Sequence, residues 1–217
     1  MHIKTEQTEV FFDSSAGDYD AQEAHGGRAR ELYPLIIERA LAAGFSDLLD
    51  IACGTGAMLS AVAEVAPDAN LAGVDLSAGM LEIAANRLGE RALLMKADAT
   101  TLPYDDASFD VITCNHAFHH FPAPTAALRE WHRVLRPGGT VIIGENRRPF
   151  LKRLYWNIMF KTRDTRGDVK FYSQGELMRL LGNAGFERID YTEIENLNCI
   201  AQAWRADDPA KSHGRPA

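Results

Sequence analysis

The residues with the clearest chemical potential lie in a short segment, LLDIACGTG, which spans Leu48–Gly56. It contains one aspartate, Asp50, and then two glycines, Gly54 and Gly56, with one residue between them. Glycine permits a sharp turn or a close approach of the backbone to a ligand, so the segment predicts a buried strand, a tight loop and the start of a helix. A fixed carboxylate at the loop entrance would repel a phosphate and would suit a positively charged ligand.

The loop differs from a dinucleotide-binding loop at one position. Such a loop has a third glycine in the pattern G-x-G-x-x-G, and Leu59 stands at that position here. The segment therefore favours a ligand without a pyrophosphate. The structural alternative is that Asp50 only caps the helix and the glycines only make the turn.

Two further carboxylates follow the next predicted strands. Asp75 ends an apolar run 19 residues after Gly56, where a carboxylate can accept two hydrogen bonds from a ribose diol. Asp98 follows a third apolar run. Ligands of open α/β sheets bind outside the carboxyl ends of the strands, so we expect these residues to surround one crevice. An ordinary turn aspartate is the alternative interpretation of Asp75.

The order of these motifs resembles that of class I S-adenosylmethionine-dependent methyltransferases, in particular the small-molecule type 11 group that includes ubiquinone and menaquinone methyltransferases. The segment LREWHRVLRPGGTVIIGE, 128–145, resembles the next helix and turn of that family. The resemblance covers about residues 10–204. It implies S-adenosyl-L-methionine as cofactor and S-adenosyl-L-homocysteine as product. The cofactor-binding residues that it implies are Tyr19, Asp50, Ala52, Cys53, Gly54, Gly56, Asp75, Leu76, Met80, Asp98, Ala99 and Asn115.

The resemblance also assigns the adenine site. The carboxylate of Asp98 would accept from the exocyclic amine of adenine, and the N–H of Ala99 would meet the ring. The apolar residues Leu76, Met80 and Leu102 would enclose the ring, although ordinary core packing is an equal alternative for Met80.

The resemblance and the alternation of strand and helix together predict a Rossmann-like, doubly wound α/β sheet of seven strands. Six strands would be parallel and the last antiparallel, with helices on both faces. Residues 1–205 would form a single domain and residues 206–217 a disordered tail. The predicted strands are 47–52, 71–75, 92–96, 109–114, 140–145, 187–194 and 197–204, and the predicted helices between them begin near residues 57, 77, 124 and 173.

An N-terminal arm followed by helices is expected over residues 1–45. Residues 1–21 are polar and predict an irregular arm. In the family, a tyrosine of such an arm, here Tyr19, shields the cofactor or bonds its carboxylate. A plain docking arm anchored by Phe11 and Phe12 is the alternative.

Three histidines follow the fourth predicted strand, at positions 116, 119 and 120. In the family this segment faces the methyl group. Histidine titrates near neutral pH, so these side chains are candidates for a general base, first His119 and then His116. No carboxylate or cysteine nearby in the sequence completes a metal site, and no metal is predicted. Packing on the cofactor or hydrogen bonding to backbone is the alternative role for each ring.

Residues 146–172 are rich in lysine, arginine and aromatic residues. In related folds this insertion covers the substrate pocket, so we expect a lid that selects an anionic or aromatic acceptor through Tyr155, Trp156 and Met159. Two alternatives are a solvated basic face over ordinary core packing and a helix on an anionic membrane surface, the latter being the least favoured.

Composition limits the classes of partner. The 217 residues are 46% hydrophobic, with a net charge of −7 and a pI near 5.5, which argues against a general nucleic-acid binder and against DNA. Three widely spaced cysteines and a polar N-terminus without a signal-peptide pattern predict a reducing cytoplasm. The oligomeric state is not predicted.

The predicted function is methyl transfer, in line, from the cofactor to a small-molecule acceptor. An RNA methyltransferase is the first alternative, but amino-methylating enzymes of that class carry N/D-P-P-Y/F where this chain has NHAF. The second alternative is a regulatory protein that binds the cofactor without turnover. A nicotinamide dehydrogenase is disfavoured by Asp50 and Leu59.

Overall fold

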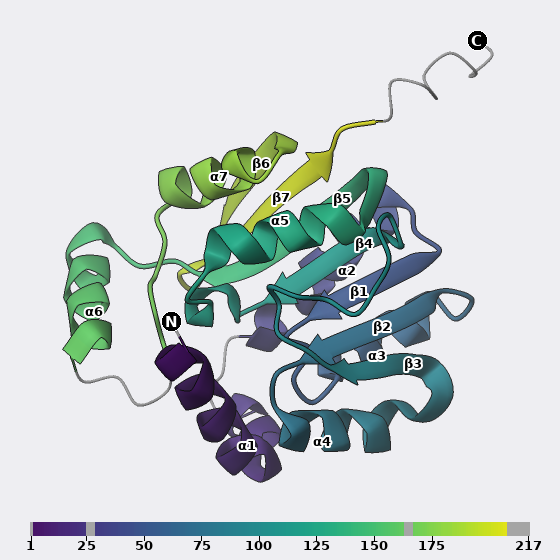
Figure 1. Ribbon diagram of the computed structural model, residues 1–217, viewed down its shortest axis with the longest axis horizontal. Coiled ribbons are helices and arrows are strands. Elements are labelled where there is room, and N and C mark those ends of the chain that lie inside the picture. The colour runs from purple at the N-terminus through teal and green to yellow at the C-terminus, as the bar shows by residue number, and fades with distance from the viewer. Residues whose placement is uncertain (1, 25–28, 163–166, 208–217) are drawn as a thin grey trace.

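The computed structural model describes residues 2–24, 29–162 and 167–207. Its centre is a seven-stranded sheet in the order β3-β2-β1-β4-β5-β7-β6, with helices on both faces (Figure 1). Strand β7 runs antiparallel to its neighbours β5 and β6, and the other pairs are parallel, which confirms the predicted fold. The strands are β1 Asp47–Ile51, β2 Asn70–Asp75, β3 Ala92–Lys96, β4 Phe109–Asn115, β5 Leu135–Asn146, β6 Phe186–Ile194 and β7 Asn198–Arg205.

Side chains on the two faces of the sheet enter two apolar clusters. Leu48 and Leu49 are adjacent on β1 and enter opposite clusters, because successive side chains of a strand point to opposite faces. Helices α5 and α7 cover one face, and α2 and α3 cover the other (Figure 1). The helices are α1 His2–Ala24, α2 Tyr33–Ala43, α3 Ala57–Val65, α4 Ala78–Leu88, α5 Pro124–Val134, α6 Phe150–Thr162 and α7 Gln174–Asn183, with short 3-10 helices η1 Ala29–Leu32, η2 Gly89–Arg91 and η3 Phe118–His120.

The N-terminal segment is helical, so the prediction of an irregular arm over residues 1–21 was wrong. Its residues show no apolar stripe, so the sequence carries no helical periodicity there, and in the structure Val10 is 68% exposed. Tertiary contacts hold the helix instead. Asp13 accepts hydrogen bonds from the Ser77 hydroxyl and the Gly79 N–H at the start of α4, and Ala16 is buried beside them.

Strand β5 begins five residues earlier than the predicted start at Thr140. Its register against β4 shifts between the pairs Phe109–Leu135 and Val111–Thr140, so the extra residues form a bulge within the strand. Gly138 has a φ of +79°, a conformation that glycine adopts without strain. The Pro137–Gly139 segment is therefore an irregular part of β5 and not a separate turn.

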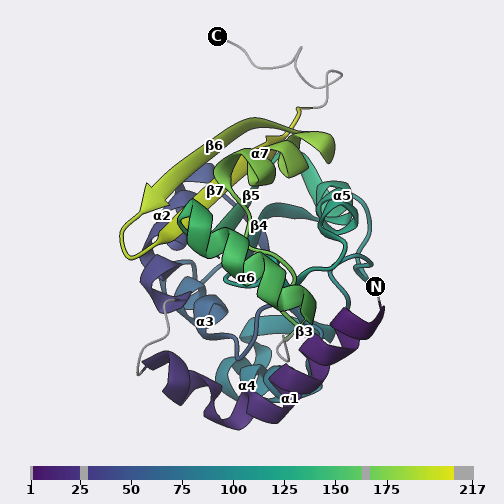
Figure 2. The ribbon, with the colours of Figure 1, turned by 90° about the vertical axis from the view of Figure 1, so that its left-hand side faces the viewer.

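Helix α6 stands beside the N-terminal end of α1, at the outer edge of the molecule (Figures 1 and 2). By their spacing, Leu151, Leu154 and Ile158 fall on one helical face, and all three are exposed, by 76%, 49% and 55%. The packed side of the helix carries Asn157 and Phe160 instead. Asn157 pairs through both side-chain atoms with the backbone of Phe171.

Among the described residues no helix is both long and apolar enough to cross a membrane. The predicted tail, 206–217, lies outside the described residues from position 208 onward.

Candidate active site

A cavity of about 230 Å³ opens at the carboxyl edge of the sheet, over the ends of β1, β2 and β4 and under α1. It lies at the ends of the neighbouring strands β1 and β4, where the strand order reverses. Ligands of open α/β sheets bind at this point. Its floor comes from the strand-end loops and its roof from α1. The roof residues are Thr5, Thr8, Glu9, Phe12 and Tyr19.

Nine of the twelve predicted cofactor residues line this cavity. They therefore converge as the strand-end argument requires, although they are spread over almost 100 residues of sequence, from position 19 to position 115. The nine are Tyr19, Ala52, Gly54, Asp75, Leu76, Met80, Asp98, Ala99 and Asn115.

The remaining three predicted residues, Asp50, Cys53 and Gly56, lie behind the cavity lining. The Asp50 carboxyl is only 3% exposed and accepts a hydrogen bond from the Thr113 hydroxyl at 2.9 Å. Burial raises the pKa of Asp50 to about 8. Leu102, predicted to enclose adenine, is also a core residue that does not reach the cavity.

The two loop glycines serve different purposes. Gly56 has a φ of +72°, and a Cβ there would lie 2.8 Å from Leu88 Cδ1 and 3.1 Å from the Ala84 Cβ. It is required because α3 packs closely on α4. Gly54, with a φ of +55°, borders the cavity, and a Cβ there would meet no protein atom within 4 Å. The space at Gly54 is thus available to a ligand.

Asp75 is the best-oriented carboxylate of the cavity wall. Its two oxygens accept the N–H groups of Gly54 and Ser77 at 2.8 and 2.9 Å. Burial outweighs these bonds and raises the pKa of Asp75 above its ordinary value. Asp98, on the next loop, is held by the N–H and hydroxyl of Thr100, both at 2.8 Å.

Asn115 Oδ1 and His116 Nε2 are buried polar atoms on the wall that have no hydrogen-bond partner among the described residues. Asn115 Nδ2 donates to the Ala29 carbonyl, which fixes the amide. His116 Nδ1 lies 3.1 Å from the Asn146 amide nitrogen, and burial lowers the pKa of His116 to about 4. His116 is therefore a neutral imidazole at neutral pH, with Nδ1 as acceptor and the proton on Nε2.

His119, the first predicted base, does not line the cavity. Its Nδ1 lies 2.9 and 3.0 Å from the two carboxylate oxygens of Glu145, and its Nε2 lies 3.5 Å from Asp168 Oδ1. Burial opposes the charged imidazolium, but Glu145 outweighs it and the pKa of His119 is raised. A base must reach the acceptor, so this position argues against direct proton transfer by His119.

His120 is the histidine that the sequence did not rank among the first two candidate bases. It lines the cavity, its ring contacts Phe12 edge-on at 5.2 Å, and its Nδ1 lies 3.3 Å from Asp168 Oδ1. His116 and His120 do not share a helical face, because His116 lies outside η3 with a positive φ of 52°. Asp168 carried no motif, so the sequence offered no signal for this contact.

The predicted lid residues Tyr155, Trp156 and Met159 are not part of the cavity lining. Tyr155 and Trp156 are 57% and 44% exposed and contact each other edge-on. The part of the chain that covers the cavity is α1.

Comparison with known proteins decides the family. A model of the family described as "Methyltransferase domain" matches residues 49–143. A demethylmenaquinone methyltransferase from Symbiobacterium thermophilum is 34% identical over 155 residues, 68% of this chain and 62% of the relative. The chain belongs to the class I S-adenosylmethionine-dependent methyltransferases, in the type 11 group. This family uses S-adenosylmethionine as its methyl donor.

Other relatives agree with this family. The demethylmenaquinone methyltransferase of Staphylococcus epidermidis is 38% identical over 122 residues, 54% of this chain and 50% of the relative. This chain thus spans between half and two thirds of the length of these relatives.

Solved structures confirm the fold. The methyltransferase in a complex with the Haloferax volcanii Trm112 activator superposes with a TM-score of 0.75 at 18% identity, covering 90% of this chain and 97% of that one. An S-adenosylmethionine-dependent methyltransferase from Thermotoga maritima gives a TM-score of 0.71 at 24% identity, covering 91% and 99%.

The residues of the cavity suit this cofactor. Two carboxylates, Asp75 and Asp98, offer acceptors for a ribose diol and an adenine amine, and the apolar side chains of Leu76 and Met80 line the same cavity. Asn115 Oδ1 is a buried acceptor that awaits a donor, which the ammonium group of the cofactor would supply. Neither lysine nor arginine occurs among the described residues that line the cavity, in keeping with a ligand that bears a sulfonium.

Proposed function

We propose that this protein transfers a methyl group from S-adenosylmethionine to a small-molecule acceptor by in-line displacement. The observation that carries the proposal is the single cavity at the switch point, with Asp75 and Asp98 on its floor and α1 above. The cofactor, when bound, supplies a methyl group on a good leaving group. The protein's task is to hold an acceptor opposite that methyl group, and positioning of this kind can contribute on the order of 7–11 kcal/mol.

The acceptor side of the cavity is aromatic. Phe12, His116, His120 and Phe121 all line it, beyond the carboxylates that suit the nucleoside. Flat rings of this kind favour a planar aromatic acceptor. The names of the demethylmenaquinone methyltransferase relatives support the same class. We therefore propose an aromatic small molecule as acceptor, bound between α1 and η3.

A hydroxyl acceptor must lose a proton during transfer. Among the three predicted histidines, His116 and His120 reach the cavity and His119 does not. His116 presents a proton at Nε2 rather than a lone pair, because its Nδ1 faces the Asn146 amide. His116 would thus act as a hydrogen-bond donor that orients the methyl acceptor.

The three free cysteines, Cys53, Cys114 and Cys199, are all buried, in keeping with the proposed cytoplasmic location.

Calorimetry on the purified chain tests the cofactor. We expect heat of binding for S-adenosylmethionine and S-adenosylhomocysteine and none for NAD. Asp75→Ala removes two well-oriented charged acceptors, so affinity should fall by at least ~10-fold. The exposed turn variant Asp105→Ala should bind as the parent does. Equal affinity of Asp75→Ala and the parent would contradict the placement of the nucleoside.

Methyl transfer to a soluble naphthoquinol or catechol tests the reaction. Formation of S-adenosylhomocysteine that depends on the acceptor would distinguish an enzyme from a regulatory protein that only binds the cofactor. Binding without product for any aromatic acceptor would favour the regulatory protein.

A further inference from the structure

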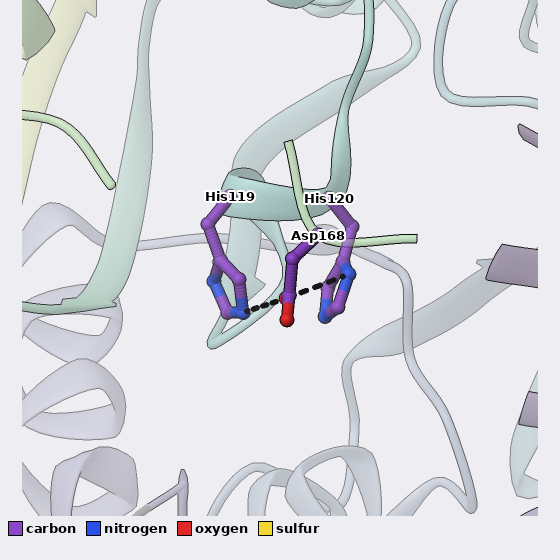
Figure 3. A group of neighbouring side chains, drawn as sticks. All are labelled: His119, His120 and Asp168. Carbon is purple, nitrogen blue, oxygen red and sulfur yellow. Dashed lines mark ion pairs between the residues drawn. The ribbon is translucent and has the colours of Figure 1, made fainter. Parts of the chain in front are cut away.

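A second group of side chains stands against the cavity wall, and of its members only His120 lines the cavity itself. His119 and His120 from η3 point toward Asp168, which follows α6 in the chain (Figure 3). Asp168 Oδ1 lies 3.5 Å from His119 Nε2 and 3.3 Å from His120 Nδ1. One potential ligand atom from each of the three residues lies within 4.8 Å of the other two.

Glu145 fixes the tautomer of His119. A carboxylate only accepts hydrogen bonds, so the contact of Glu145 with His119 Nδ1 requires a proton on that nitrogen. In the neutral imidazole, Nε2 then carries a lone pair, and this lone pair faces the carboxylate oxygen of Asp168. Two acceptors facing each other repel, and a positive charge between them removes the repulsion. A metal ion or an additional proton on Nε2 would supply that charge.

The two separations that involve Asp168 fit a metal ion. Zinc binds imidazole nitrogen and carboxylate oxygen at about 2.0–2.2 Å in a tetrahedral arrangement, which places neighbouring ligand atoms about 3.3–3.6 Å apart. The separations of Asp168 Oδ1 from the two histidine nitrogens, 3.3 and 3.5 Å, fall in this interval, whereas the ligand atoms of the two histidines lie within the wider limit of 4.8 Å. The contact of His119 Nδ1 with Glu145 is also the carboxylate–histidine–metal arrangement that orients a ligand imidazole and raises its basicity.

The backbone brings the three residues together before any ion binds. The N–H groups of Val169 and Lys170 both donate to the His119 carbonyl, at 2.9 and 3.1 Å. Gly167 passes so close to α1 that a Cβ there would lie 2.8 Å from the Thr8 Cα. The segment that carries Asp168 is thus fixed on η3 and on α1. The donors are also shielded from water, since His119 and His120 are 7% and 9% exposed.

We propose that His119 Nε2, His120 Nδ1 and Asp168 bind one divalent transition-metal ion of the zinc class, with Glu145 as the outer partner of His119. Three protein ligands leave a fourth position for water or another small ligand. The ion would tie the segment after α6 to η3 and fix the His120 ring on the cavity wall. The sequence predicted no metal because Asp168, the carboxylate among the three ligands, lies 48 residues beyond His120.

The test uses the full chain without a histidine tag, freed of metal by chelation and then titrated with Co²⁺ and Zn²⁺. We expect one Co²⁺ per chain with the intense visible absorption of a tetrahedral site, displaced by Zn²⁺. Asp168→Asn should weaken Co²⁺ affinity by at least ~10-fold, and Glu145→Gln by ~10–100-fold. The matched histidine variant His132→Gln, on α5 and outside the cluster, should bind Co²⁺ as the parent does.

Nitrogen-15 NMR of the histidine rings decides the matter even if a variant fails to fold. Zn²⁺ should shift His119 Nε2 and His120 Nδ1 in the parent protein and leave His132 unchanged. Sub-stoichiometric Co²⁺ binding, or equal affinity of Asp168→Asn and the parent, would overturn the proposal. So would a His119 ring that carries protons on both nitrogens and does not respond to Zn²⁺, because the imidazolium would then donate one N–H to Glu145 and the other to Asp168. Cofactor calorimetry is independent of all these outcomes.

Discussion

Asp50 is a carboxyl group in surroundings that disfavour its charge. It lies within β1, hydrogen-bonded to Thr113, and burial raises its pKa from 3.8 to about 8. A carboxyl with a raised pKa in the folded state contributes stability that is fully present below its unfolded pKa and is lost as the pH rises through the folded value. The window for this loss therefore runs from about pH 4 to about pH 8.

We expect Asp50→Asn to become more stable relative to the parent as the pH rises through this window. Asparagine keeps the shape of the protonated carboxyl without the charge. Across this window, the unfolding free energy of Asp50→Asn should rise relative to that of the parent by an amount on the order of 5 kcal/mol. Urea unfolding at several pH values without ligand measures it.

Asp68→Asn, a change at an exposed turn position, is the control and should show no such trend. A constant difference between Asp50→Asn and the parent across the window would mean that the buried carboxyl does not titrate there.

The two loop glycines separate stability from ligand binding. Gly54→Ala should cost only the strain of a positive φ, about 1–2 kcal/mol, because its Cβ meets no protein atom. Gly56→Ala adds a clash with Leu88 and Ala84, and should cost about 2–5 kcal/mol in total. Urea unfolding gives both values.

Calorimetry should show that Gly54→Ala loses more affinity for S-adenosylmethionine than Gly56→Ala does, because the added methyl group of Gly54→Ala occupies the cavity. A larger loss of affinity in folded Gly56→Ala than in Gly54→Ala would contradict this division of roles.

At the scale of elements, α1 is a cover held by a few polar contacts. Asp13 accepts from Ser77 and Gly79, and Asp20 accepts from Thr55 and pairs with Arg87. The Ser77 hydrogen bond lowers the pKa of Asp13, so its contribution is present above its ordinary pKa of 3.8 and is lost at lower pH. A cover with so little buried apolar surface should open more readily than the sheet.

We expect Asp13→Ala to loosen α1 without unfolding the domain. Hydrogen exchange of α1 amides should accelerate by ~10-fold, whereas the amides of β1 and β4 should not change. Dissociation of S-adenosylmethionine should accelerate in parallel. Asp18→Ala, at an exposed position of the same helix, is the control. Unchanged α1 exchange in Asp13→Ala would mean that other contacts hold the cover.

The elements also show what the sequence could reveal. Strands and loops from β1 to β4 were predicted almost to the residue, because apolar runs and glycines encode them locally. Helix α1 was missed because only tertiary contacts stabilise it. The packed face of α6 cannot be predicted from its apolar residues, because Leu151 and Ile158 stay exposed while polar Asn157 packs on Phe171. The approach of Asp168 to His120 depends on the path of the whole insertion, which no local pattern specifies.

At the scale of the whole molecule, charge is unevenly distributed. The net charge is −7, yet α6 and the residues before it carry Arg147, Arg148, Lys152, Arg153 and Lys161. A nucleic-acid enzyme needs a basic surface that leads to its active site. Here the basic residues lie outside the cavity lining, and the lining contains the acidic residues Glu9, Asp75 and Asp98. The arrangement favours a small acceptor over RNA.

We expect no RNA binding tighter than ~100 µM at physiological salt, the weak end of non-specific affinity. Fluorescence anisotropy with a labelled single-stranded RNA and with a hairpin measures it between low and physiological ionic strength. Weak attraction at low salt should be lost in the double variant Lys152→Ala/Arg153→Ala, because α6 supplies the exposed positive charge. Micromolar binding that persists at physiological salt and competes with the aromatic acceptor would contradict the small-molecule assignment and favour the RNA methyltransferase.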